Sequence, residues 1–257
     1  MLKKLEKYDS LWINKIMYIY YAICLVISVL TRIMASFTET FMGNLIYSIL
    51  RSCAIACFIS CLINVLMRIW VRFRNNMYKD ESYLTHTLPV SKNTLYNAKI
   101  LASITSLLHS LYIVIICALI VFLDKNLLDT LKEFLSTREN VIIFIGIILI
   151  FILECMCIAL SGITGIVLGH ISNNHKTLKS IGWGIIIYII IQVINLICLY
   201  LTSLFDKNIG SLFTASTDIN ILNIKSLIYV ATILYLVFDI ILYFIGKKEF
   251  NKGVNVD

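Results

Sequence analysis

The stretch that decides the fold is Asp80–Ser103, which reads DESYLTHTLPVSKNTLYNAKILAS. It is a long polar interval between apolar runs, and it holds the only proline of the chain, Pro89. Because proline lacks an N–H and disfavours helix in the residue before it, a short helix that starts at Asp80 is predicted to end at about Leu88. Ser91 then has the position of an N-cap for a second helix, which runs into the next apolar segment.

This arrangement predicts a short helix held crosswise below the membrane on a stiff corner. Tyr83, Leu84 and Leu88 lie on adjacent turns of the predicted helix. They are expected to give it a small apolar and aromatic face directed toward the cytosol. Such a face suits docking to a soluble partner protein.

On either side of this corner the chain is nearly all apolar. Of its 257 residues, 60% are hydrophobic and 14% are charged, whereas a soluble domain has about 45–50% and about 25%. The long apolar runs are each close to the roughly 20 residues that cross a bilayer. We therefore predict an all-α membrane protein with a single transmembrane domain over residues 1–257. Its six spans are expected at about 16–36, 44–67, 99–123, 140–169, 181–205 and 224–246.

Positive charge sets the predicted orientation of these spans. Most of the 22 Lys and Arg residues fall in the N-terminal segment, in 68–99, in 170–180 and in the C-terminal segment. The cytoplasmic side of a membrane protein carries such an excess, so a multi-pass protein of the cell membrane with both termini cytoplasmic is predicted. Because the net charge of +7 lies at span ends rather than in a basic groove, nucleic acid is not an expected partner.

Two further helices are predicted to lie on the membrane surface. Residues 2–15 carry apolar residues such as Leu5 and Trp12 on one side and lysines mostly on another. This is the pattern of an amphipathic interfacial helix. The apolar spacing of residues 124–139 fits a helix on the outer leaflet.

The corner also carries a family resemblance. The run DESYLTHTLPVS, Asp80–Ser91, followed by Lys99, resembles the loop between the second and third spans of ABC-2-type permeases, the membrane subunits of ATP-driven exporters. In that family the loop forms a coupling helix that sits in a groove of the ATPase subunit. The resemblance therefore implies a set of docking residues: Asp80, Glu81, Tyr83, Leu84, His86, Leu88 and Pro89.

The resemblance implies an assembly as well. Two permease chains, either two copies of this chain or this chain with a sister permease, form the pathway, and an ABC ATPase docks below. ATP and Mg belong to that ATPase, and no cofactor is expected on this chain, which has no G-x-x-x-x-G-K-[ST] phosphate loop. Short outer loops favour export of amphipathic or lipophilic cargo, such as an antimicrobial peptide or a drug. In related permeases the connection before the last span can re-enter the membrane, which residues 206–223 permit.

Charged residues within the spans are candidates for a substrate path. Glu154 lies about midway along the fourth apolar run, where a charge costs about 2.5–3.5 kcal/mol unless it faces protein or water. It either lines the path or is a structural carboxyl paired between helices. Arg51 is the most plausible opposite charge, and Asp239 lies in the inner half of the sixth span. Arg32, near the outer end of the first span, is predicted to be an interfacial anchor.

Two patterns of small residues favour helix packing. Cys53, Cys57 and Cys61 recur every fourth residue. Three thiols on one face would suit a soft metal, but close approach of helix backbones is the favoured interpretation, and no metal site is predicted. The glycines of 162–169 allow a hinge, although packing against a neighbouring helix is again favoured.

Two other functions compete with transport. A non-transporting scaffold or sensor would recruit a cytosolic partner through the same corner. An intramembrane enzyme would need Glu154 to converge with His109 or His170, although the predicted spans place Glu154 near the membrane centre and His170 at its inner edge. The chain has no H-E-x-x-H, no C-x-x-C and no serine nucleophile elbow, so no catalytic site is expected on it.

Overall fold

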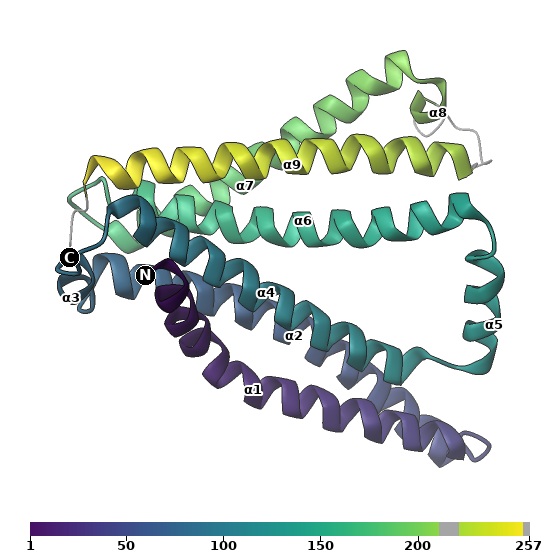
Figure 1. The fold of residues 1–257 in the computed structure, drawn as a ribbon. Coiled ribbons are helices and arrows are strands. Elements are labelled where there is room, and N and C mark those ends of the chain that lie inside the picture. Colours follow the sequence, from purple (N-terminus) through teal and green to yellow (C-terminus); the bar gives the residue numbers. More distant parts are fainter. Residues whose placement is uncertain (211–220, 254–257) are drawn as a thin grey trace. The chain divides into compact units, whose positions relative to one another are not determined.

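The structure, a computed structural model, describes residues 1–210 and 221–253. Within these residues the regular structure is all helical and contains no strand. Six of the described helices are long and apolar enough to cross a membrane, which confirms the all-α class and the number of candidate spans. They are α1 (Leu2–Met34), α2 (Phe41–Tyr78), α4 (Lys92–Phe122), α6 (Arg138–Gly169), α7 (Lys176–Phe205) and α9 (Ile221–Lys252) (Figure 1).

Most helices extend past at least one end of their predicted span, and the largest extension at a C-terminal end is that of α2. The second span was predicted at 44–67, whereas the helix continues to Tyr78. The additional residues 68–78, RIWVRFRNNMY, contain no glycine or proline, so nothing in the sequence ends the helix where the apolar run ends. The predicted boundary therefore marks a change of polarity and not the end of the helix.

Residues 2–15 and the first predicted span belong to one helix, α1. It runs without interruption from Leu2 to Met34, and the short 3-10 helix η1 (Ala35–Phe37) follows it. In Figure 1 the purple first turns of α1 run at an angle to the rest of the helix. The interfacial helix predicted over 2–15 is therefore not a separate element, and its location at a membrane surface stays a prediction.

The chain divides into two compact units. Unit 1 consists of Met1–Asn76 and Thr87–Lys132, and unit 2 consists of Met77–His86 and Glu133–Asp257. The expectation of a single membrane domain stays a prediction.

Unit 1 is built on the packing of α1 along α4. The buried side of α1 includes Met17 and Tyr21, and α4 contributes the small buried residues Ser106 and Ser110. The side-chain amide of Asn14 donates to Ser106 Oγ at 3.3 Å, and the hydroxyls of Tyr21 and Ser110 are hydrogen-bonded. Small residues and polar pairs of this kind hold membrane helices together, because lipid supplies no hydrophobic drive between them.

Unit 2 is built on α6, which packs against both α7 and α9. A Cβ on Gly165 would overlap the backbone N and Cα of Gly184, and a Cβ on Gly169 would overlap the backbone of Ser180. The hydroxyl of Thr164 donates to a backbone carbonyl of α9 at 3.3 Å. The glycines at the end of α6 therefore let it approach α7 closely, which confirms the packing interpretation.

Shorter helices follow α4 and α7. α5 (Lys125–Phe134) is the helix expected within 124–139, and its location on the outer leaflet stays a prediction. α8 (Lys207–Gly210) begins the connection that leads to α9. Residues 211–220 of this connection lie outside the described residues, and with them most of the re-entrant segment considered for 206–223.

Candidate functional site

The corner between α2 and α4 contains α3 (Ser82–His86), a helix of 5 residues. The helix predicted over 80–88 was too long at both ends. The physical reason at its C-terminal end is the proline, because the residue before Pro89 is disfavoured in the helical region. The N–H of Val90 also donates to the carbonyl of Leu88 at 2.7 Å, which closes a tight turn around Pro89.

α4 begins at the residue predicted for it. Ser91 is the N-cap, with the extended backbone (φ −65°, ψ 147°) that a cap residue adopts. Its Oγ accepts the N–H of Thr94 at 3.3 Å, which satisfies one of the unpaired donors of the first turn. The corner is therefore a short helix, a proline turn and a capped helix start, in that order along the chain.

Contacts on one side of α3 hold it in place. Ser82 and Thr85 are buried, at 0% and 6% exposure. The ring of His86 donates from Nε2 to the carbonyl of Met77 at 3.2 Å, which joins α3 to the last turn of α2. The same ring lies 6.5 Å, centroid to centroid, from the ring of Phe250 on α9. These contacts fix which side of α3 is exposed.

The other side of α3 is apolar and aromatic. Tyr83 is 68% exposed and Leu84 is 75% exposed. Leu88, in the turn that follows, is 41% exposed. Exposed apolar side chains that are adjacent, on a backbone held in place, are typical of a protein interaction site.

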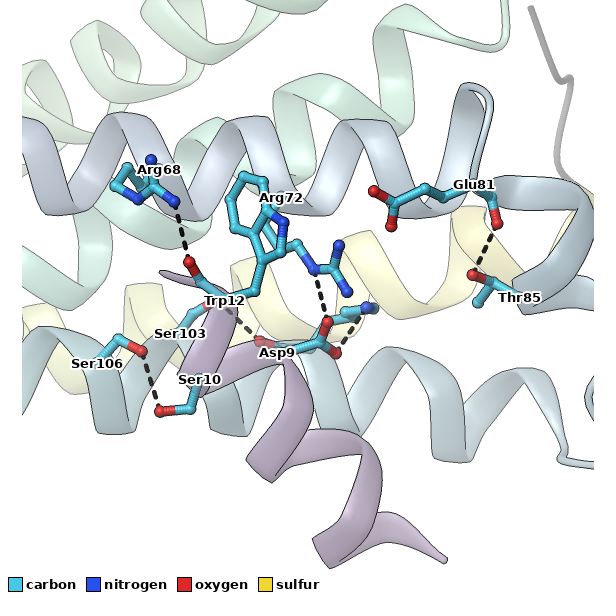
Figure 2. A network of polar contacts seen from close by, with 10 residues as sticks. Asp9, Ser10, Trp12, Arg68, Arg72, Glu81, Thr85, Ser103 and Ser106 are labelled. Atoms are coloured by element: carbon cyan, nitrogen blue, oxygen red, sulfur yellow. Dashed lines mark hydrogen bonds and ion pairs between the residues drawn. The ribbon is translucent and has the colours of Figure 1, made fainter. Parts of the chain in front are cut away.

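The remaining residues predicted for docking lie in the turns that flank α3. Asp80 and Pro89 are exposed, and Glu81 is half-buried. The carbonyl of Glu81 accepts the hydroxyl of Thr85 at 3.0 Å (Figure 2). Along the chain, Asp80 and Glu81 thus precede the exposed pair Tyr83 and Leu84, and Pro89 follows it.

A buried ion cluster lies within unit 1 and is centred on Asp9 of α1 (Figure 2). Asp9 is 3% exposed. Its Oδ1 accepts from Arg72 Nε at 2.8 Å, and its Oδ2 accepts from Lys99 Nζ at 2.6 Å. Since Arg72 lies on α2 and Lys99 on α4, one carboxylate joins three helices. Loss of this carboxylate would remove one partner from two buried ion pairs, which is costly.

The next turn of α1 adds a second set of contacts to α2. Arg68 donates from Nε to the carbonyl of Ile13 at 2.8 Å and from Nη2 to the carbonyl of Trp12 at 2.9 Å. The guanidinium groups of Arg68 and Arg72 lie over the Trp12 indole, at 4.5 and 5.0 Å from its centroid. These are cation–π distances, so two arginines one turn apart on α2 hold the start of α1.

Sequence reasoning missed Asp9 because it considered only the apolar side and the lysine side of residues 2–15. The buried side of this segment runs through Asp9, Ile13 and Met17. A signal was present, because these three positions are in phase with the stripe that stays buried further along α1. A carboxylate on a packing stripe indicates a cation on a neighbouring helix, since a buried charge needs a partner.

Within unit 2, a row of polar side chains crosses α6, α7 and α9. The hydroxyl of Tyr188 donates to Glu154 Oε1 over a long 3.5 Å, and Gln192, one turn along α7, donates to the hydroxyl of Tyr235 at 3.5 Å. One turn beyond, Asp239 is 6% exposed, and neither of its carboxylate oxygens has a hydrogen-bond partner in the described part of the chain. Whether Glu154 lines a path or has a structural role stays open.

Arg51, the partner considered for Glu154, belongs to the other unit. Its guanidinium lies 5.0 Å from the centroid of the Phe122 ring, and its pairing with Glu154 stays a prediction. The pairing of Glu154 with His170 considered for an enzyme does not form a site. His170 caps the C-terminal end of α6, about 24 Å along the helix from Glu154, and its ring is stacked on Tyr78 at 4.1 Å.

The cysteine row on α2 is buried to different degrees. Cys61 is buried, Cys57 is half-buried and Cys53 is exposed. Only the end of the row at Cys61 therefore packs closely against protein. In residues 1–210 and 221–253, no group of three His, Cys, Asp or Glu residues lies close enough to hold a metal ion.

No family model, curated protein or solved structure matches this chain. The resemblance of the corner to ABC-2-type permeases therefore rests on Asp80–Ser91 and Lys99 alone. Of these residues, Ser91 caps α4 and Lys99 pairs with Asp9.

Proposed function

We propose that this chain is the membrane subunit of an ATP-driven exporter, and that a separate ATPase docks on its corner at Asp80–Pro89. The observation that carries the proposal is the exposed pair Tyr83 and Leu84 on a short helix whose other side is anchored. Six helices that are long and apolar enough to cross a membrane could line a transport pathway. The sequence has no phosphate loop, so the energy for transport comes from a partner.

The connections of α3 suit the transmission of force. α2 ends at Tyr78 and α3 begins at Ser82, so only a short turn separates them. On the other side, the ring of Pro89 restricts the backbone before the capped start of α4. Short and stiff connections pass on a displacement instead of absorbing it, so a partner that moves α3 also moves the ends of α2 and α4.

The ion cluster extends this coupling to α1. Arg72 lies near the end of α2 and Lys99 near the start of α4, and Asp9 binds both. The ends of α1, α2 and α4 are therefore expected to move together as a rigid body. ATP binding to the partner favours one position of this body over another, which changes the side of the membrane to which the pathway opens.

The assembly that this proposal requires contains two permease chains and two ATPase subunits. The second permease is another copy of this chain or a sister protein, and ATP and Mg bind to the ATPase. The connections on the face away from the corner are short, since α5 has only 10 residues. An exporter of amphipathic or lipophilic cargo needs no larger outer domain, whereas capture of a scarce nutrient does.

The test is purification of the chain with its ATPase from the native membrane, followed by measurement of ATP hydrolysis. Leu84→Asp places a charge at the centre of the exposed pair. Recovery of the ATPase is expected to fall by about tenfold or more, because burial of a leucine contributes about 1.5–3 kcal/mol. Leu178→Asp is the matched control, since Leu178 is 74% exposed near the start of α7, and it should leave recovery unchanged.

Each outcome separates two functions. Unchanged recovery of the ATPase with Leu84→Asp would show that the docking assignment is wrong. An ATPase that binds through the corner but hydrolyses ATP at the same rate without this chain would favour the scaffold or sensor. Because Leu84 is 75% exposed, the variant should unfold at the same temperature as the wild-type protein, which excludes misfolding as the cause.

A further inference from the structure

A pocket of about 580 Å³ lies in unit 1, toward the end at which α4 leads into α5. The end of α1, the first half of α2 and α5 also contribute lining residues. Two arginines line the pocket, Arg32 in the last turn of α1 and Arg51 in α2. The volume is within the range of about 300–1,000 Å³ that is usual for sites of small ligands.

These arginines have no counter-ion in the protein as described. Over residues 1–210 and 221–253, neither Arg32 nor Arg51 forms an ion pair or a hydrogen bond. The guanidinium of Arg51 lies 5.0 Å from the centroid of the Phe122 ring. Arg51 lies about 15 Å along α2 from its first residue. This part of α2 belongs to the helix that is apolar enough to cross a membrane. Both arginines are exposed, so their guanidinium groups are accessible to a ligand, and an arginine in an apolar segment is stabilised by an anionic one.

The lining indicates the class of anion. Guanidinium groups bind phosphate oxygens through paired N–H donors, and two of them in one pocket suit a phosphate group better than a halide. Asp124 also lines the pocket. Together with Arg32 and Arg51 it gives the lining a net charge of +1. A singly charged phosphodiester matches this charge better than a phosphate monoester. Hydroxyls such as that of Tyr47 add hydrogen-bond donors.

We propose that this pocket binds a phosphodiester anion, with its phosphate held between Arg32 and Arg51. A phospholipid headgroup supplies this chemistry at the surface of a membrane, and a soluble glycerol phosphodiester supplies it in water. Apolar lining residues, among them Val121, Phe122 and Leu127, suit the glycerol and first acyl carbons of a lipid. The site is independent of the proposed transport function.

The experiment measures the dissociation constant of three ligands from the rise in Tm of the delipidated full-length protein in detergent. Phosphatidylglycerol carries both the phosphodiester and the acyl chains. Diacylglycerol with the same chains lacks the phosphate, and glycerophosphoglycerol lacks the chains. Phosphatidylglycerol is expected to bind at least about tenfold more tightly than diacylglycerol, because charge-assisted hydrogen bonds to the phosphate are lost in the latter. If phosphatidylglycerol and diacylglycerol bind to the wild-type protein with equal affinity, the proposal is overturned.

Variants locate the site. Arg32→Gln and Arg51→Gln should each weaken phosphatidylglycerol binding by about tenfold. Lys132→Gln is the matched control, because Lys132 lies on α5, has a side chain that is 75% exposed, and does not line the pocket. Loss of affinity no greater in the arginine variants than in Lys132→Gln would overturn the proposal. Arg51→Lys keeps the charge and should recover part of the affinity.

The soluble ligand distinguishes the sources. If glycerophosphoglycerol binds as tightly as phosphatidylglycerol, and loses affinity in Arg51→Gln, the pocket takes a soluble phosphodiester. If it binds far more weakly, the pocket takes a lipid. A soluble ligand that binds equally well to the wild-type protein and to both arginine variants would show that the pocket does not hold the phosphate.

Discussion

Replacement of Asp9 by asparagine tests whether the ion cluster holds α1, α2 and α4 together. Asp9→Asn keeps the size of the side chain, but it removes the carboxylate that pairs with Lys99, which is 6% exposed. Removal of one partner from a buried ion pair costs about 3–5 kcal/mol. Arg72 loses less, because its side chain is 13% exposed and rests on Trp12. We therefore expect the free energy of unfolding to fall by about 3 kcal/mol, the lower end of that range.

For a chain of this length, such a loss lowers Tm by roughly 6–12 °C. The measurement is thermal unfolding of the purified protein in detergent, followed by circular dichroism. Asp129→Asn is the matched control, because the carboxylate of Asp129 is 76% exposed and lies 3.6 Å from Lys132. An exposed pair of this kind contributes less than about 1 kcal/mol, so the control should hardly change Tm.

A double-mutant cycle isolates the pair. Lys99→Met removes the buried ammonium, so the double variant Asp9→Asn with Lys99→Met should be more stable than Asp9→Asn alone. We expect a coupling energy of at least about 1 kcal/mol between the two positions. If Asp9→Asn unfolds at the same temperature as Asp129→Asn, or if the two substitutions are additive, the reasoning about the cluster is refuted.

Two further predictions concern unit 2. Gly165→Ala should cost about 1–3 kcal/mol, because its Cβ would meet the backbone of Gly184. Gly182→Ala is the control, because there is open space around its Cβ, and helix propensity should raise the free energy of unfolding by up to about 1 kcal/mol. If Gly165→Ala has a higher Tm than Gly182→Ala, the packing of α6 on α7 is contradicted. Asp239→Asn should leave the free energy of unfolding unchanged or raise it, since the buried carboxylate has no hydrogen bond to lose among the described residues and a buried charge without a partner is costly. A drop in Tm as large as that of Asp9→Asn would show that Asp239 has a partner.

The helices and the corner could be predicted from sequence because their causes are local. A long apolar run is sufficient for a helix that crosses a membrane. Pro89 ends the region of α3, and Ser91 caps α4 through a hydroxyl three residues away from the N–H that it accepts. The predicted lengths of α2 and α3 were wrong, because other local features decide where these helices end. α2 continues past its apolar run, since no residue there breaks a helix, and α3 is shorter than 80–88, since the turn around Pro89 takes up its end.

The sequence by itself determined the all-α class, the six candidate spans, the proline corner and the exposure of an apolar pair within it. Only the tertiary structure decided that Asp9 binds Arg72 and Lys99, which are separated from it by 63 and 90 positions. It also decided that Arg32 and Arg51 share one pocket. The reason is that hydropathy and capping depend on neighbours along the chain, whereas an ion cluster or a pocket depends on which faces of distant helices meet. Those faces are selected by packing of small and polar residues, whose partners the one-dimensional pattern does not identify.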